Sequence, residues 1–275
     1  AYHELLTLAE LLLAPVATSL MGKGCFPENH PLSVGLLGMH GTREANRLVM
    51  EADVVLAIGM RFSDRTTGRA ADFCPDAHII HIDIDSAEMG KNKRVEVPIV
   101  ADARKTLAAV HSLIEKRLAK KRESTWVKRV HEVRKELQGQ LENDEKAFSP
   151  PNILRKLRQI LPSNAIVTTE VGQNQMWSAL YFKAYEPRTF ISSGGLGTMG
   201  FGFPASIGAK VARPDVPVVD IAGDGSFMMT ENCLATSVME RIPVTVVILN
   251  NRMLGMVAQW QRIFYERRYS GTQLG

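Results

Sequence analysis

The sequence has few of the features that mark secreted, membrane or zinc-binding proteins. Its three cysteines, Cys25, Cys74 and Cys233, lie far apart and form no CxxC pair, so a reduced, cytoplasmic compartment fits best. No apolar run approaches the length of about 20 residues that a membrane-spanning helix needs, and no stretch has the pattern of a signal peptide. The seven histidines follow no HExxH or similar metal-binding spacing.

A strong excess of one charge is also lacking. The sequence has 33 Lys and Arg residues against 29 Asp and Glu residues, which gives a net charge of +4. Much of this excess lies between Lys116 and Lys135, in the run KRLAKKRESTWVKRVHEVRK. A nucleic-acid surface is one interpretation of this run, but a solvated helix face is the better one. We therefore expect neither nucleic acid nor a membrane among the partners.

The first half of the sequence has the pattern of an α/β domain. It opens inside a helical pattern without an initiator methionine, so we expect it to be cut from something longer. Short apolar runs predict strands at 15–18, 53–59, 78–84 and 97–100, with a loop-like stretch at 21–41 and a helix at 42–51. Asp102 is predicted to cap a long helix. This alternation predicts a first domain at 1–118, followed by a helix-bearing linker at 119–149.

The second half repeats the alternation. Pro150 and Pro151 suit a helix start, and strands are predicted at 165–170, 189–192, 216–222 and 244–249. A helix at 230–240 separates the last two strands, which indicates that they are parallel. The length of 275 residues, with 45% hydrophobic composition, suffices for two such domains. The predicted fold class is therefore α/β, with two doubly wound parallel-sheet domains, the second at 150–275.

Polar clusters follow the last two predicted strands. GDGS, at 223–226, ends the first of them, and Asn250-Asn251 ends the second. Ligands of such sheets bind outside the carboxyl ends of the strands, so both clusters are expected at one crevice. Asp224 and Asn251 offer the hard oxygen ligands that Mg²⁺ prefers. Gly225 and Ser226 open the next helix, where free N–H groups favour a phosphate. Two ordinary turns rich in Gly, Asp and Asn are the alternative interpretation.

The GDGS and NN clusters, with 27 positions from Asp224 to Asn251, resemble the thiamine diphosphate signature of the transketolase and decarboxylase superfamily. The resemblance implies that Asp224 and Asn251 bind the metal, together with the main-chain carbonyl of Met253. A single GDG would carry a high false-positive risk, but the spaced block in its strand and helix context favours the functional interpretation.

A glycine-rich loop precedes this block. Residues 195–200 match GxGxxG, and Asp220 lies 20 residues further on, as in a dinucleotide fingerprint. That strand continues past Asp220, however, and a dinucleotide site would leave Asp224 and Asn251 without a role. GGLGTMGFGFPASIGA is instead similar to the aminopyrimidine-holding segment of acetohydroxyacid synthases (acetolactate synthases). The resemblance implies that the Gly197 carbonyl and the Met199 N–H pair with the ring, while the Met199 side chain bends the cofactor.

Two further segments extend the resemblance. EVGQNQMW is similar to the diphosphate-contacting EVGQHQMW of that family, with Asn174 in place of the usual histidine, and it implies contacts from Val171, Gly172, Gln173 and Asn174. LNNRMLGMVAQWQRIFYERRYS is similar to the segment that lines the family's acceptor pocket, which implies roles for Met256, Val257 and Trp260. From spacing alone, this Met/Val/Trp stripe is more simply a helix face packed in the core.

The first domain resembles the family's flavin-binding middle domain. Arg61 and Arg65 offer guanidinium groups that suit a pyrophosphate, although solvated loop arginines are an equally good interpretation of the sequence alone. Ser63 stands where many relatives have aspartate. The resemblance places a structural FAD against ten residues, namely Leu37, Gly38, Met39, His40, Gly59, Arg61, Arg65, Asp83, Ile84 and Asp102.

Together these resemblances imply a cytoplasmic, thiamine diphosphate- and Mg²⁺-dependent transferase that decarboxylates pyruvate and joins it to a second 2-keto acid, pyruvate or 2-ketobutyrate. The family implies a homodimer or tetramer with shared active sites, and a small regulatory subunit. Its activating glutamate lies in a pyrimidine-binding domain with no counterpart here, so we expect the 275-residue chain alone to lack normal turnover. The alternatives are a pyruvate oxidase or 2-keto-acid decarboxylase, a dinucleotide oxidoreductase and a non-catalytic cofactor-binding fragment.

Overall fold

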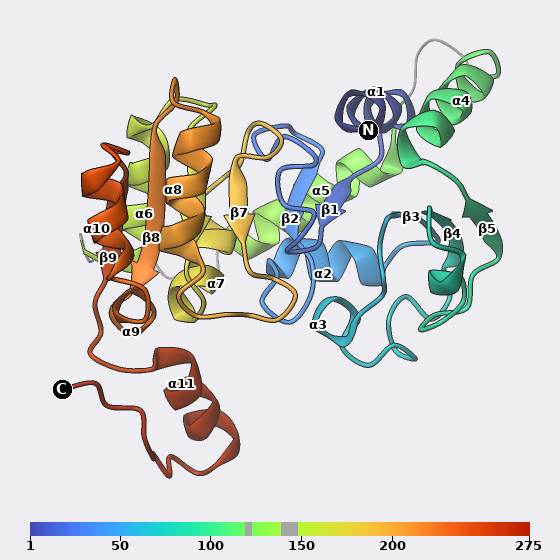
Figure 1. The fold of residues 1–275 in the computed structure, drawn as a ribbon. Coiled ribbons are helices and arrows are strands. Elements are labelled where there is room, and N and C mark those ends of the chain that lie inside the picture. The colour runs from blue at the N-terminus through green and yellow to red at the C-terminus, as the bar shows by residue number, and fades with distance from the viewer. Residues whose placement is uncertain (119–122, 139–147) are drawn as a thin grey trace. The chain divides into compact units, whose positions relative to one another are not determined.

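The computed structural model describes residues 1–118, 123–138 and 148–275. The chain divides into two compact units, residues 1–143 and residues 144–275. Each unit combines helices with parallel strands, as Figure 1 shows, so the predicted α/β class is confirmed. Within the described residues, no helix is long and apolar enough to cross a membrane.

The first unit contains two parallel sheets. One pairs β1 (Val16–Thr18) with β2 (Ser33–Leu36), and the other has the order β3 (Val54–Ile58), β4 (His78–Asp83), β5 (Val97–Val100). The accompanying helices are α1 (Tyr2–Leu12), α2 (Arg43–Met50), α3 (Asp64–Thr67), η1 (Ser86–Glu88), α4 (Ala103–Glu115) and α5 (Thr125–Gln138).

Helices and loops cover both faces of the three-stranded sheet. Leu8 of α1, Ile82 of β4 and Leu107 of α4 form a buried cluster on one face. Phe62 and Phe73, from the segment between β3 and β4, pack with Ile79 on the other face. Ile79 and Ile82 of β4 therefore enter different cores, as residues on opposite faces of a strand do.

The helix expected between residues 119 and 149 belongs to the first unit. Val130 and Val133 of α5 pack against Val34 of β2 and Leu48 of α2. Arg129 of α5 also forms an ion pair with Glu51, with a shortest N–O distance of 2.7 Å. Both apolar packing and charge pairing thus dock α5 onto α2. The remaining predicted linker positions, 119–122 and 139–147, lie outside the described residues.

One detail of the first unit differs from the sequence prediction, and another agrees with it. The loop expected at 21–41 is wrong in part, because it contains β2, whose residues alternate between half-buried and buried. Gly35 makes this strand hard to recognise in the sequence, because glycine is uncommon within strands. Its φ is 92°, and a Cβ there would lie 2.9 Å from Thr42. The capping role of Asp102 is confirmed, because its carboxylate accepts a hydrogen bond from the Lys105 N–H at 2.9 Å.

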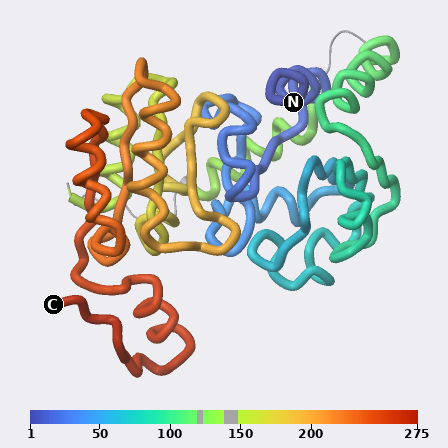
Figure 2. The backbone as a smooth tube through the Cα atoms, in the orientation of Figure 1, coloured from blue at the N-terminus to red at the C-terminus, as the bar shows by residue number. Residues whose placement is uncertain are grey.

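The second unit has one four-stranded parallel sheet in the order β7 (Phe190–Ser192), β6 (Ile166–Thr169), β8 (Val218–Gly223), β9 (Thr245–Leu249). Its helices are α6 (Pro150–Ile160), α7 (Gln173–Tyr181), α8 (Gly202–Ala212), α9 (Asp224–Met228), α10 (Cys233–Met239) and α11 (Gly255–Phe264). The two prolines occupy the first turn of α6 as predicted. Figure 2 shows the path of the backbone through this sheet and its helices.

The sheet of the second unit has a core on each face. Leu154 of α6 packs with Phe182 and Ile221 on one face. Ala209 of α8 packs with Ile166 and Val218 on the other. Because β8 lies between β6 and β9 in a parallel sheet, the segments that follow these three strands emerge at the same edge. This arrangement brings the polar clusters of the sequence together.

Candidate functional site

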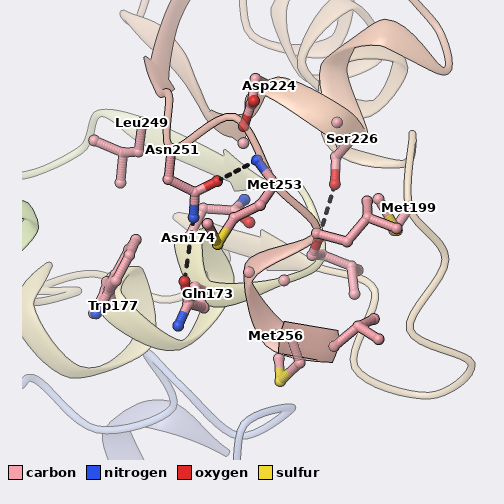
Figure 3. Close-up of a pocket in the computed structure, with 17 residues that line it drawn as sticks. Gln173, Asn174, Trp177, Met199, Asp224, Ser226, Leu249, Asn251, Met253 and Met256 are labelled. Carbon is pink, nitrogen blue, oxygen red and sulfur yellow. Dashed lines mark hydrogen bonds between the residues drawn. The ribbon is translucent and has the colours of Figure 1, made fainter. Parts of the chain in front are cut away.

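A pocket lies at the carboxyl ends of β6, β8 and β9, and Figure 3 shows its lining side chains. The segments that follow these strands form most of its wall. They carry residues that the sequence assigns to metal, phosphate, ring and acceptor binding. The lining residues are 171–174, 223–226 and 253–257, together with Trp177, Met199, Leu249 and Asn251.

Three residues that line this pocket, Asp224, Asn251 and Met253, offer oxygen donors for a metal ion. Asp224 is the first residue of α9, directly after β8, and Asn251 follows β9. The Asn251 side chain is held at both ends, because its Oδ1 accepts from the Met253 N–H at 3.1 Å and its Nδ2 donates to Gln173 at 3.2 Å. These bonds orient the amide, so its oxygen and nitrogen have distinct partners (Figure 3).

The donor chemistry at this position fits Mg²⁺. No group of three or more His, Cys, Asp or Glu side chains that could hold a metal ion occurs within residues 1–118, 123–138 and 148–275. Mg²⁺ does not require such a cage, since it commonly binds one or two protein carboxylates, substrate phosphates and water. One carboxylate from Asp224, one amide oxygen from Asn251 and the carbonyl of Met253 provide a suitable partial set.

The pocket also gathers the starts of three helices. Its lining includes the first residues of α7, α9 and α11. The first N–H groups of a helix have no partner within that helix and attract anions. The Ser226 hydroxyl donates to the Val171 carbonyl at 2.7 Å, which ties the start of α9 to the end of β6. The Ser226 side chain is therefore occupied, and its main-chain N–H remains the group suited to a phosphate.

Gly255 allows two polar side chains to approach α11 closely. A Cβ at this position would lie 2.6 Å from Asn251 Nδ2 and would overlap Gln173 Oε1. The Gln173 Nε2 donates to Gln259 at 2.9 Å, so Gln173 bridges Asn251 and α11. A side chain at position 255 would displace this bridge beside the metal donors.

Asn174, the departure from the family pattern, is a buried residue of the pocket lining. Its Nδ2 donates to the Ile221 carbonyl of β8 at 3.1 Å. Its Oδ1 faces the backbone of Gly172 and Gly223, since a Cβ on these glycines would lie 3.0 and 3.4 Å away. A carboxamide has one acceptor oxygen and two donor hydrogens, so a phosphate contact from Asn174 must use its second amide hydrogen.

The glycine-rich loop delivers Met199 to the pocket. Gly197 has a φ of 64° and lies outside the lining set, while Met199 belongs to it. The loop is held at one end by the Ser193 hydroxyl oxygen, which accepts from the Thr198 N–H at 3.0 Å. At the other end Glu170 accepts from the Gly200 N–H at 2.7 Å. The sequence alone does not single out Glu170, because the N–H groups from which it accepts lie 30 and 33 residues further along the chain.

Asp220 occupies the middle of β8 and is fully buried. The Thr168 hydroxyl donates to its Oδ1 at 2.9 Å. Burial, with a smaller contribution from Glu170, raises the pKa of Asp220 to about 7. A ribose-binding acid must reach the ligand outside the strand end. Asp220 is therefore not placed to bind a ribose, as the acidic residue of a dinucleotide site would have to be.

The three predicted acceptor residues all lie on α11. Met256 and Val257 line the pocket. Trp260 lies outside the lining set, and its ring stacks on Phe264 with centroids 4.9 Å apart. The structure thus brings two of these residues to the pocket and pairs the third with an aromatic neighbour on the same helix.

The predicted flavin positions lie in the first unit, in the segments that follow β2, β3, β4 and β5. Two of these segments are in direct contact, since the Met39 N–H donates to the Arg65 carbonyl at 2.9 Å. Gly38 permits this approach, because its φ is 113° and a Cβ would lie 2.8 Å from the Thr66 Cα. Burial, and then the nearby Arg65, lower the pKa of His40. The remaining positions cluster by strand end, with Gly59 and Arg61 after β3, Asp83 and Ile84 at the end of β4, and Asp102 after β5.

Comparison with protein families assigns both units. The family described as "Thiamine pyrophosphate enzyme, central domain" matches residues 1–110. The family described as "Thiamine pyrophosphate enzyme, C-terminal TPP binding domain" matches residues 170–274, which include the whole pocket. The chain therefore belongs to the thiamine pyrophosphate enzyme family.

Within this family the chain is similar to acetolactate synthases, as its sequence motifs predict. It is 51% identical to the "Probable acetolactate synthase large subunit" of Methanocaldococcus jannaschii, over 100% of this chain and 47% of that protein. It is 46% identical to acetolactate synthase 1 of Nicotiana tabacum, over 99% of this chain and 41% of that protein. The acetolactate synthase large subunit of Corynebacterium glutamicum is 46% identical, over 100% and 44% respectively. The chain spans less than half the length of these relatives.

Proposed function

We propose that this chain forms the metal- and diphosphate-binding part of an acetolactate synthase catalytic subunit, together with its middle domain. The observation that carries the proposal is the gathering of Asp224, Asn251 and Met253 around one pocket at the ends of β8 and β9. The names of the similar proteins support the same activity. The reaction is decarboxylation of pyruvate and joining of the remaining two-carbon unit to pyruvate or 2-ketobutyrate.

Each wall of the pocket has a separate task in this proposal. Asp224, Asn251 and the Met253 carbonyl hold Mg²⁺. The N–H groups at the starts of α7 and α9, at positions 172–174 and 225–226, bind the diphosphate. Gly197 and Met199 position the aminopyrimidine ring. When bound, thiamine diphosphate supplies the electron sink for loss of CO₂ and for the new carbon–carbon bond.

The apolar residues of α11 exclude water from the acceptor side. Met256 and Val257 line the pocket beside the polar anchor, so an acceptor 2-keto acid meets apolar groups there. A dry wall strengthens the electrostatic interactions inside and protects reactive species from hydrolysis. Trp260, on the same helix, is the third residue proposed for the acceptor side.

FAD is the second proposed cofactor, bound by the strand-end segments of the first unit. Arg61 and Arg65 are exposed and available for a pyrophosphate. An Arg65→Ala variant is expected to weaken FAD binding at least tenfold in a fluorescence titration. Arg69→Ala is the matched control, because Arg69 lies just after α3, the helix that carries Arg65, and pairs with Asp72. Equal affinities for the two variants would remove Arg65 from the flavin site.

The proposal includes a homodimer or tetramer with a shared active site, a small regulatory subunit and a cytoplasmic location. The activating glutamate comes from a pyrimidine-binding domain, so the 275-residue chain is expected to bind cofactor without normal turnover. Acetolactate formed from pyruvate at ordinary rates by this chain alone would contradict that expectation.

Calorimetric titration of thiamine diphosphate tests the anchor directly. Wild-type chain is expected to bind in the presence of Mg²⁺ and to lose binding when a chelator is added. Asp224→Ala is expected to abolish the Mg²⁺-dependent heat. Asp215→Ala is the matched control, because Asp215 is an exposed residue paired with Arg213 near the opposite end of β8. Unchanged binding by Asp224→Ala would refute the assignment.

A further inference from the structure

Two carboxyl groups are buried under the glycine-rich loop. Glu170, directly after β6, and Asp220, on the adjacent strand β8, are both fully buried. They are close enough for the charge of Glu170 to influence Asp220. Buried acidic residues are rare unless they are paired with a cation or strongly hydrogen-bonded. Their position beside the loop that carries Met199 suggests a reason for their presence.

Glu170 anchors the end of this loop. One carboxylate oxygen accepts from the Gly200 N–H at 2.7 Å, and the other accepts from the Phe203 N–H at 3.0 Å. These two N–H groups flank the start of α8. Gly200 directly follows Met199, so the anchor fixes the point from which the Met199 side chain enters the pocket.

Asp220 lies against the same turn and lacks comparable support. Its Oδ1 accepts from the Thr168 hydroxyl, whereas its Oδ2 has no hydrogen-bond partner among the described residues. Gly202 of α8 touches this carboxyl group so closely that a Cβ there would overlap Oδ1. A protonated Asp220 avoids placing a second buried negative charge beside Glu170.

The surrounding elements provide no neutralising cation for this pair within the described parts of the chain. From β6, the groups that face Asp220 are Thr168 and Glu170. Lys210 of α8 donates its ammonium group to the Pro214 and Val216 carbonyls. The residue paired with Asp220 on β9 is Val246. The pair therefore has no nearby cation to offset a negative charge on Asp220. Ionisation of Asp220 becomes favourable only when the glycine-rich loop opens and admits water.

We propose that Glu170 and Asp220 are positioning residues that hold the glycine-rich loop, and with it Met199, against the pocket, Glu170 by accepting the N–H bonds of the loop and Asp220 by packing against it in the protonated form. Glu170 accepts the two N–H bonds, while Asp220 carries a proton. The part that Met199 plays in cofactor binding rests on the proposed function. The anchoring of the loop does not depend on it.

The proposal has a definite pH dependence. Burial, and then Glu170, raise the pKa of Asp220 from 3.8 to about 7 in the closed site. When the loop over Asp220 opens, water reaches the carboxyl group and its pKa returns to the ordinary value. Opening therefore releases a proton between these two pH values and becomes easier as the pH rises toward 7, by up to about tenfold per pH unit. Above pH 7 both forms are deprotonated, so the dependence levels off.

Hydrogen exchange of the 275-residue chain, measured by mass spectrometry without cofactor, tests this device. Protection of peptides covering 198–203, corrected for intrinsic exchange, is expected to fall from pH 4.5 to 7 and then level off. Asp220→Asn mimics the protonated acid and is expected to abolish this slope. Asp215→Asn is the control and should retain the wild-type slope, because Arg213 lowers the pKa of Asp215 to about 2, outside this range.

Glu170→Gln tests the anchor itself. The substituted amide nitrogen cannot accept an N–H bond, so protection of the same peptides is expected to fall at least tenfold at every pH. Glu231→Gln, at an exposed position, is the matched control and should leave protection unchanged. Unchanged protection in a folded Glu170→Gln variant would overturn the anchoring role.

The comparison of wild type with Asp220→Asn decides the role of the Asp220 proton even if Glu170→Gln does not fold. The same slope in both proteins would overturn it. A failure of thiamine diphosphate binding would instead count against the proposed function, because no cofactor enters the exchange experiment.

Discussion

Gly202→Ala is expected to be among the most damaging small substitutions in the second unit. Gly202 begins α8 where this helix rests on β6 and β8. A Cβ there would lie 2.7 Å from both the Glu170 nitrogen and the Thr169 carbonyl carbon, and it would overlap the Asp220 carboxyl group. Backbone atoms of a central strand cannot move aside as a flexible side chain does. The helix must therefore lift from the sheet, which costs about 3 kcal/mol in the free energy of unfolding.

Gly208→Ala supplies a matched control on the same helix. Gly208 is exposed, and a Cβ there meets no atom within 4 Å. Replacing glycine by alanine at an open helix position stabilises by about 0.5–1 kcal/mol. The two single-methyl substitutions are thus expected to differ by about 4 kcal/mol, with opposite signs.

Urea unfolding followed by hydrogen exchange of β6 and β8 peptides measures this difference for the second unit alone. The midpoint is expected to fall for Gly202→Ala and to rise for Gly208→Ala. Similar midpoints for both variants would refute the close packing of α8 on the sheet. A destabilised Gly208→Ala would show that the helix surface is not open at that position.

Three further perturbations test other parts of the molecule. Raising the pH from 4 to 7 is expected to reduce the unfolding free energy of the second unit by up to about 4 kcal/mol, because the pKa of Asp220 is about 7 in the folded state and 3.8 in the unfolded state. Urea titrations at several pH values measure this decline, and Asp220→Asn should remove it. Gly255→Ala is expected to weaken Mg²⁺-dependent thiamine diphosphate binding at least tenfold in calorimetry while the thermal midpoint stays within about 2 °C, since it displaces side-chain ends beside Asn251 and no backbone; unaltered affinity would contradict the Gln173 bridge. Leu154→Ala, at a fully buried position, is expected to destabilise by about 2–5 kcal/mol, whereas Leu196→Ala, at a position 96% exposed, should stay within about 0.5 kcal/mol; equal urea midpoints would contradict the core assignment.

Much of the fold could be predicted because local signals agree with it. The strand at 97–100, the helix start at Pro150 and the cap at Asp102 are each written in a few neighbouring residues. β2 could not be predicted in this way, because Gly35 adopts a positive φ where the pairing of β1 with β2 is irregular. Its alternating burial depends on packing against α2 and α5, from residues up to about a hundred positions away.

The residues of the candidate site also differ in whether local sequence signals predict them. Asp224 and Asn251 could be found because their spacing follows from the β8–β9 crossover. Glu170 could not, since its role depends on N–H groups 30 and 33 residues further along the chain. Helical spacing also does not distinguish Trp260, which lies outside the pocket lining and stacks on Phe264, from Met256 and Val257, which line it.

Manganese binding followed by electron paramagnetic resonance tests the central claim most directly. Mn²⁺ takes the same oxygen ligands as Mg²⁺, and its free and bound forms have different signals. With thiamine diphosphate present, the wild-type chain and Asp215→Ala are expected to deplete the free Mn²⁺ signal with one site per chain, whereas Asp224→Ala should leave that signal intact. Depletion that persists in Asp224→Ala, or that needs no thiamine diphosphate, would contradict a metal and diphosphate site at the ends of β8 and β9.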